Sequence, residues 1–135
     1  MRIAFGTDET TDLTRSLCAT LAGQGHQVAV VADGEPWPDT GRRVAEAVAS
    51  GAADRGVVCC WTGTGVSIAA NKVDGVRAAL CTDAATAAGA RRWNDANVLA
   101  FGLRLSTVAV VEEMVAAFLD TNADPDERDE IAKLS

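Results

Sequence analysis

The chain has 135 residues, 48% of them hydrophobic, and its 12 Lys and Arg against 19 Asp and Glu give a net charge of −7. A chain of this length closes one hydrophobic core, so we expect a single domain over residues 1–135, with an acidic tail over residues 123–135. The acidic balance and the lack of a Lys/Arg cluster exclude nucleic acid and anionic membranes as expected partners. Because no signal peptide and no membrane-spanning apolar run is found, we expect a cytoplasmic protein.

Four cysteines and one histidine narrow the chemistry further. Cytoplasmic thiols stay reduced, and the four cysteines, Cys18, Cys59, Cys60 and Cys81, contain no CxxC pair. We therefore expect neither disulfides nor a metal site. His26 would have to be the base of any Ser-His or Cys-His catalytic pair.

Apolar runs alternate with stretches of helical periodicity from one end of the chain to the other. In chain order, the pattern predicts a strand over 2–6, a helix from residue 13 to the glycines at 23–25, a strand over 26–32, a helix capped by Asp39 or Thr40 and ending before Gly51, a strand over 56–60, a helix over 66–72, a strand over 76–80, a helix over 83–93, a strand over 97–101 and a helix over 107–119. A loop and a short terminal helix follow Thr121.

Short, nearly continuous apolar strands separated by helices indicate a parallel sheet that is covered on both faces. The chain is therefore predicted to be an α/β protein with a Rossmann-like, doubly wound three-layer fold and a five-stranded parallel sheet. In the flavodoxin-like strand order 2-1-3-4-5, ligands bind between the carboxyl ends of strands 1 and 3. This rule selects two loops, residues 7–11 and residues 61–65.

The second loop lies in the segment CCWTGTGVSIAANK. Gly63 and Gly65 allow the backbone to bend so that successive N–H groups and the start of a helix point at one oxyanion or phosphate. The alternative is an ordinary tight turn from strand to helix. The segment is neither a Walker A loop nor a dinucleotide fingerprint, since no GK[ST] follows and Ile68 stands where a third glycine is needed.

Two thiols end the third predicted strand, and they have different expected roles. Neighbouring side chains of a strand point to opposite faces, so one of Cys59 and Cys60 belongs to the core. A thiol near a helix N-terminus can act as a base or nucleophile, whereas a thiol buried among valines is inert.

The first loop carries Asp8 and Glu9. These acids could orient sugar hydroxyls or transfer protons, or Asp8 could instead cap the helix that begins near Thr11. Trp93 and Asn94 follow a helix antiparallel to strand 4, so they lie at the opposite end of the sheet. They can reach the crevice only from a neighbouring subunit; the alternative is that Trp93 covers the core.

Several segments together resemble the family of type B ribose-5-phosphate isomerases and galactose-6-phosphate isomerases, from Met1 to about Thr121. The resemblance is carried by GEPWPD, RRVAEAVASGAADRGVV, CWTGTGVSIAANK, GVRAALCTD and NDANVLAFGLR. It implies a homodimer, able to pair further into a tetramer, with sites between subunits. It also implies an aldose–ketose isomerase that acts on a sugar or sugar phosphate through a cis-enediolate, without a metal or an organic cofactor.

Position by position, the resemblance implies that Cys60 is the base that removes the C2 proton. The enediolate oxygens would be stabilised by Thr62, Gly63, Gly65 and Ser67. The substrate-binding positions that it implies are Asp8, Asn71, Asn94 and Arg104, with Arg104 near the phosphate.

The chain departs from the family pattern where the family places its chemistry. Glu9 and Trp93 stand where the family has histidines, the second of which opens the sugar ring. Trp61 replaces a glycine and would line the pocket with an aromatic face. The basic C-terminal segment that holds phosphate is replaced by DPDERDE, which would repel a dianion.

Three hypotheses follow. The chain is an isomerase for a non-phosphorylated or differently anchored substrate, with Cys60 as base and Glu9 as second proton carrier. Alternatively, it is an ordinary sugar-phosphate isomerase that recruits Arg91, Arg92 or Arg104 for the phosphate. In the third, it is a non-catalytic relative that binds a small polyol or another ligand.

Overall fold

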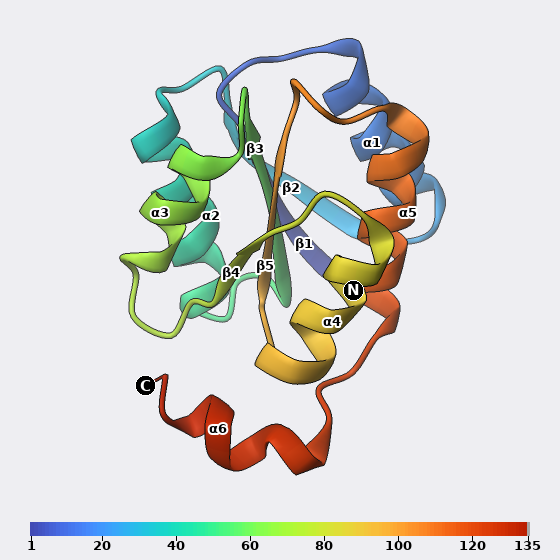
Figure 1. The fold of residues 1–135 in the computed structure, drawn as a ribbon. Coiled ribbons are helices and arrows are strands. Elements are labelled where there is room, and N and C mark those ends of the chain that lie inside the picture. The colour runs from blue at the N-terminus through green and yellow to red at the C-terminus, as the bar shows by residue number, and fades with distance from the viewer. Residues whose placement is uncertain (135) are drawn as a thin grey trace.

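The computed structural model describes residues 1–134 and shows a five-stranded parallel sheet between two layers of helices (Figure 1). The strands are β1 (Arg2–Thr7), β2 (Gln27–Asp33), β3 (Arg55–Cys60), β4 (Ala78–Leu80) and β5 (Val98–Gly102). The helices are α1 (Asp12–Gly23), α2 (Trp37–Ala49), α3 (Thr64–Asn71), α4 (Ala84–Asn94), α5 (Val108–Asp120), the 3-10 turn η1 (Pro125–Glu127) and α6 (Arg128–Ala132). The predicted α/β class and the predicted alternation of elements are confirmed.

The strand order is β2-β1-β3-β5-β4, so the predicted order 2-1-3-4-5 is wrong at its last two positions. All residues of β5 are buried, which requires a neighbour on each side and cover on both faces. The three residues of β4 are partly exposed, and a strand this short is typical of a sheet edge. Since β1 and β3 remain neighbours, the crevice between their carboxyl ends is unaffected, and the ends of β5 and β4 join it along the same edge.

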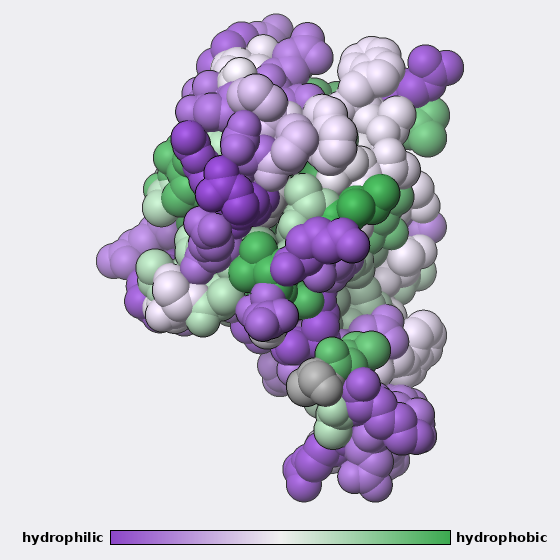
Figure 2. Space-filling view, turned by 90° about the vertical axis from the view of Figure 1, so that its left-hand side faces the viewer, coloured by the Kyte–Doolittle hydropathy of each residue, from purple (hydrophilic) through white to green (hydrophobic). Residues whose placement is uncertain are grey.

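Helices α2 and α3 cover one face of the sheet, and α1, α4 and α5 cover the other (Figure 1). Each face has its own apolar core, one around Val44, Val58 and Val66 and the other around Phe5, Phe101 and Phe118. The view onto the α2 and α3 side is largely hydrophilic, with the C-terminal segment projecting below the sheet (Figure 2). No helix among residues 1–134 is long and apolar enough to cross a membrane.

Strand β2 departs from the expectation that the sheet is covered on both faces. Only one of its seven residues is fully buried, and the Val30 side chain is 51% exposed. β2 is an edge strand, paired with β1 alone, so its apolar run lacks the double cover that β3 and β5 have.

Three helices begin with a side-chain cap. Thr11, Asp83 and Thr107 each accept a backbone N–H as N-caps of α1, α4 and α5. The predicted Asp39 or Thr40 cap of α2 is wrong, because the helix begins at Trp37, directly after Pro36, and no side chain caps it. Pro38, in the first turn, suits a helix start because the φ of proline is already helical.

A buried cation fixes the end of the sheet opposite the crevice. Arg91 is only 3% exposed; its Nη1 lies 2.7 Å from Asp95 Oδ1 and donates to the Ala96 carbonyl at 2.6 Å, and its Nε donates to the Thr121 carbonyl at 3.1 Å. Arg77 also pairs with Asp95, which has a left-handed backbone with φ of 48°. Arg91 is therefore committed to the fold, which excludes it as a phosphate ligand.

Replacing Arg91 should destabilise the protein strongly. Arg91→Met removes the ion pair and leaves the Ala96 and Thr121 carbonyls without their donor, at a cost of about 2–3 kcal/mol in the free energy of unfolding. The matched control is the exposed neighbour, Arg92→Met, which should change stability by less than about 0.5 kcal/mol. Urea denaturation followed by circular dichroism measures both, and equal losses in the two variants would contradict the assignment.

Candidate active site

The two thiols at the end of β3 lie on opposite faces of the sheet, as alternation predicts. Cys59 packs with the core that contains Leu17 and Phe101, and burial raises the pKa of its thiol to about 12. Cys60 lies on the α2 and α3 side, where the Gly63 N–H donates to its Sγ at 3.2 Å. Cys59 is therefore the core residue, and Cys60 is the candidate reactive thiol.

The N-terminus of α3 lies directly beyond Cys60. The helix begins at Thr64, two residues earlier than predicted, and its N-cap Gly63 has a left-handed φ of 80° with no side-chain capping bond. The Thr62 and Thr64 hydroxyls hydrogen-bond to each other at 2.9 Å. No side chain thus competes for the first N–H groups of the helix, which carry the positive end of its dipole and suit an oxyanion.

Two glycines let the loop lie against β5. A Cβ on Gly63 would come within 2.7 Å of the Phe101 carbonyl carbon, and one on Gly102 within 2.6 Å of the Thr62 carbonyl oxygen. The Leu103 and Arg104 N–H groups donate to the Cys60 and Trp61 carbonyls, both at 2.9 Å. The end of β5 and the two residues after it therefore hold residues 60–63 in place.

Gly65 does not form the bend in the loop that the sequence predicts. It is helical rather than a bend in the loop, and the space that a side chain would fill is taken by the indole of Trp37, whose Cε3 would lie 2.8 Å from a Cβ. Sequence reasoning missed Trp37, since only the packing of α2 on α3 brings it to this loop. Ser67 lies about one turn after the start of α3 at Thr64 and is half-buried.

The acid pair follows β1, next to β3. Thr11, not Asp8, caps α1, so the capping alternative for Asp8 is wrong. Among the described residues, Asp8 Oδ1 is buried without a hydrogen-bond partner, and burial together with the charge of exposed Glu9 raises the pKa of Asp8. The Thr7 hydroxyl donates to the Glu9 carbonyl at 2.6 Å and fixes the turn. Asp8 therefore caps no helix, and its half-buried side chain lies beside the end of β3, where the Asp8 N–H donates to the Cys59 carbonyl.

A cavity of about 290 Å³ lies on the other side of the loop, at the ends of β3, β5 and β4. Its lining residues are Thr62, Thr64, Leu80, Cys81, Thr82, Gly102, Arg104, Leu105 and Ser106. No carboxylate of residues 1–134 lies within salt-bridge distance of the exposed Arg104, so its charge is available to an anion. Trp61 is 52% exposed on the same loop.

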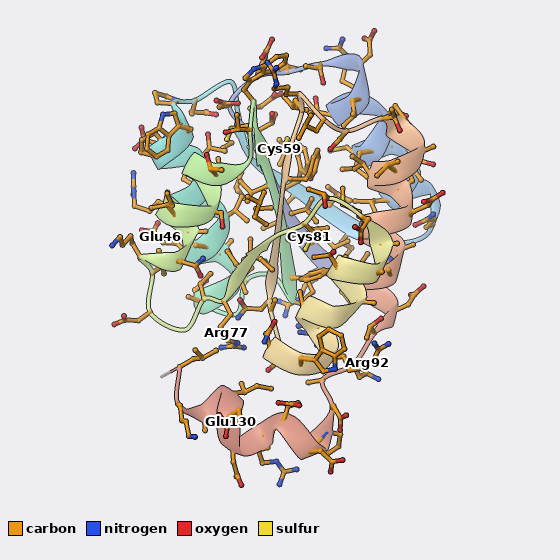
Figure 3. The ribbon with its side chains drawn as sticks, viewed as in Figure 1. Glu46, Cys59, Arg77, Cys81, Arg92 and Glu130 are labelled. Atoms are coloured by element: carbon orange, nitrogen blue, oxygen red, sulfur yellow. The ribbon has the colours of Figure 1, made fainter. Side chains whose placement is uncertain are left out.

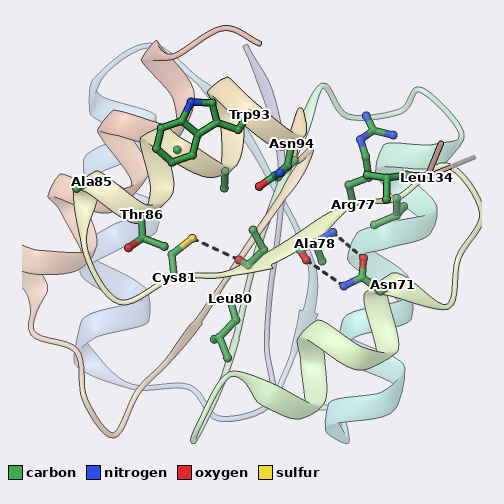
Figure 4. Close-up of a pocket in the computed structure, with 15 residues that line it drawn as sticks. Asn71, Arg77, Ala78, Leu80, Cys81, Ala85, Thr86, Trp93, Asn94 and Leu134 are labelled. Atoms are coloured by element: carbon green, nitrogen blue, oxygen red, sulfur yellow. Dashed lines mark hydrogen bonds between the residues drawn. The ribbon is translucent and has the colours of Figure 1, made fainter. Parts of the chain in front are cut away.

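Three predicted site residues, Asn71, Trp93 and Asn94, lie away from Cys60 in the folded chain. The Asn71 amide exchanges two hydrogen bonds with the backbone of Ala78, at 2.8 and 2.9 Å, and so ties α3 to β4. Asn71, Trp93 and Asn94 line a groove of about 950 Å³ along the exposed edge of β4 (Figure 4). Arg77 and Arg92 mark this end of the molecule, opposite Cys59 (Figure 3). One chain alone does not bring these three residues to Cys60.

Comparison with known proteins identifies the family. Residues 3–134 match the family model described as Ribose/Galactose Isomerase. Galactose-6-phosphate isomerase subunit LacB of Clostridium acetobutylicum is 38% identical over 98% of this chain and 80% of its own length. Ribose-5-phosphate isomerase B of Escherichia coli is 37% identical over 87% of this chain and 83% of its own length.

Solved structures give the same result. Ribose-5-phosphate isomerase B of Clostridium thermocellum superposes with a TM-score of 0.91 at 38% identity, covering 99% of this chain and 95% of that one. A ribose 5-phosphate isomerase of Thermotoga maritima superposes with a TM-score of 0.90 at 33% identity, covering 98% and 96% of the two chains. The chain belongs to the ribose/galactose isomerase family.

Proposed function

We propose that this chain is an aldose–ketose isomerase in which Cys60 moves a proton between C1 and C2 of a sugar. The observation that carries this proposal is the Cys60 thiol, which receives the Gly63 N–H at the uncapped start of α3. A base and an oxyanion site are thereby placed side by side, as an enediolate intermediate requires. Relatives named as isomerases of ribose 5-phosphate, galactose 6-phosphate and D-erythrulose 4-phosphate support the reaction class.

The proposed step balances as two proton shifts. Cys60 Sγ, as the thiolate, takes the proton from C2. The electrons of that C–H bond form the C1–C2 double bond, the carbonyl electrons move to O1, and the N–H groups at the start of α3 stabilise the enediolate oxygens. The thiol then returns the proton to C1. Glu9 takes the proton of the O2 hydroxyl and supplies one to O1, in place of the histidine that the family pattern has there.

Charge at the site favours a sugar that is held mainly through its hydroxyl groups. Asp8 and Glu9 lie at one side of the loop, and Arg104 is the exposed cation at the other. The C-terminal segment carries five acids, Asp124, Asp126, Glu127, Asp129 and Glu130, in place of the basic phosphate clamp that the family pattern has. Because it packs at the Arg92 end of its own chain, it would face the site of a second copy. A phosphate group on the substrate would thus gain one ion pair, through Arg104.

The site is completed by a second copy of the chain. Trp93 and Asn94 lie on the groove along β4, at the end of the molecule away from Cys60. In a homodimer related by a two-fold axis, the groove of each copy would be covered by the other, and each copy would supply Trp93 and Asn94 to the Cys60 loop of its partner.

Removing the thiol should abolish proton transfer and leave the fold intact. In D2O, the Cys60→Ala variant should incorporate no deuterium at C2 of ribose or ribose 5-phosphate, measured by proton NMR, because the base is missing. The matched control is Cys59→Ala, which truncates the neighbouring thiol in the opposite core and should retain exchange. Deuterium incorporation by Cys60→Ala at the wild-type rate would disprove the assignment; its absence in the wild type would favour a non-catalytic relative.

A phosphate group on the sugar should add little to its binding affinity. One partly exposed ion pair contributes up to about 1 kcal/mol, so the dissociation constants of ribose and ribose 5-phosphate should differ by about fivefold or less. Arg104→Gln should remove this difference, and Arg92→Gln should leave it unchanged. Isothermal titration calorimetry measures each constant, and a preference for ribose 5-phosphate of a hundredfold would contradict the proposed anchor.

Two inactive variants should restore each other if the site is shared. In a mixture of Cys60→Ala and Asn94→Ala chains, each mixed dimer carries one site with both residues intact, so about a quarter of all sites should recover. Sedimentation velocity should show a dimer at micromolar concentration. A monomeric profile, or no recovery after the chains have exchanged partners, would exclude the shared site.

A further inference from the structure

Trp37 lies at the edge of the sheet where the candidate site is found, yet it has no part in the proposed mechanism. It is the first residue of α2, preceded by the N-cap Pro36 and followed by Pro38, and 47% of its surface is exposed. The fixed φ of the two prolines restricts how the chain enters the helix. The indole is therefore carried by a rigid turn.

The indole of Trp37 lies on the backbone of Gly65. A Cβ built on Gly65 would lie 2.8 Å from Cε3, 2.9 Å from Cδ2 and 3.3 Å from Cζ3, all atoms of the six-membered ring. One helical turn further along α2, a Cβ on Gly41 would lie 2.7 Å from the Val66 carbonyl oxygen. Positions 37 and 41 thus form one face of α2 that rests on the first turn of α3.

The turn under this face is the one that supplies the oxyanion site. It begins at Gly63, which donates to Cys60 Sγ, and its first helical hydrogen bond runs from the Ser67 N–H to the Gly63 carbonyl at 3.2 Å. A helix N-terminus is usually fixed by a capping side chain, and α3 has none. Capping would also occupy the N–H groups that an oxyanion needs. Packing from outside fixes the turn and leaves them free.

We propose that Trp37 is a positioning residue for the isomerisation: its indole fixes the first turn of α3, so that the N–H groups there and the Gly63-to-Cys60 bond keep their direction. Trp37 acts through Gly65 and touches no reacting atom. The catalytic consequence rests on the proposed function, whereas the structural consequence does not.

The test compares Trp37→Ala with Trp37→Phe and with a matched control, Val48→Ala. Val48 is on the same helix and is half-buried, but it packs toward Gly56 on β3, away from the loop. In Trp37→Ala, the Ser67 N–H should exchange with D2O at least about tenfold faster than in Val48→Ala, because its hydrogen bond closes the released turn. Exchange rates that match between the two variants would overturn the inference.

Kinetics separate positioning from general destabilisation. With ribose or ribose 5-phosphate in D2O, Trp37→Ala should lower kcat for C2 exchange at least about tenfold and change KM less than about threefold, since misdirected donors weaken transition-state stabilisation. Trp37→Phe should restore most of the rate. Val48→Ala should stay within about twofold of the wild type; a loss of kcat in proportion to Tm in all three variants would show packing alone and overturn the inference.

A double variant tests the contact itself and needs no substrate. Gly65→Ala should lower Tm in the wild-type background, where the indole blocks the new methyl group, and should raise or preserve Tm in the Trp37→Ala background. Equal effects in both backgrounds would overturn the proposed contact. If the wild-type protein shows no C2 exchange, the proposed isomerase fails, while Ser67 exchange and the double variant still decide whether Trp37 fixes the turn.

Discussion

The candidate site depends on the close approach of two elements, β5 and α2, to residues 62–66, which join β3 to α3 and form the first turn of α3. At three contacts, a glycine lacks the side chain that would keep the elements apart: Gly102 under the Thr62 carbonyl, Gly65 under Trp37, and Gly41 against the Val66 carbonyl. Strand β5 supports the segment on one side and α2 on the other. Interiors packed this closely do not deform gradually, so the direction of the N–H groups beside Cys60 is set by the fold.

Few of the positive charges of this chain, whose net charge is −7, are free to bind a ligand at the carboxyl edge of the sheet. Six of the ten arginines are paired with a carboxylate: Arg2 with Asp54, Arg15 with Asp12, Arg42 with Asp39, Arg43 with Glu35, and both Arg77 and Arg91 with Asp95. Arg104 has no such partner among residues 1–134, while Asp8 keeps a buried carboxyl oxygen without a hydrogen bond. In the proposed function, a ligand with many hydroxyl groups and little negative charge suits this distribution, because its hydroxyls can donate to the Asp8 carboxylate.

Local sequence patterns predicted the helices and strands. The order of the strands and the contacts between helices depend on tertiary packing, which these patterns do not show. Apolar runs located all five strands, and alternation along β3 showed that Cys59 and Cys60 face opposite sides. The order of β4 and β5 was mispredicted because the strand order depends on which strand is covered from both faces, although the short apolar run of β4 is itself a sign of an edge. Trp37 could not be found from sequence, since its contact with Gly65 joins two helices that pack only in the folded chain. The positions of Trp93 and Asn94 followed from helix direction alone.

In the proposed mechanism, ring opening needs an acid other than Trp93. An indole has no proton to transfer at neutral pH, so ring opening cannot be assigned to position 93. Asp8 and Glu9 are the titratable pair beside the loop, and burial together with the neighbouring charge raises the pKa of Asp8. A carboxyl group with a raised pKa keeps its proton to a higher pH than an ordinary carboxyl group, so it can act as an acid. In the proposed mechanism, Asp8 is therefore assigned both to binding hydroxyls and to protonating the ring oxygen, and the charge of Glu9 adds to burial in raising the pKa of Asp8.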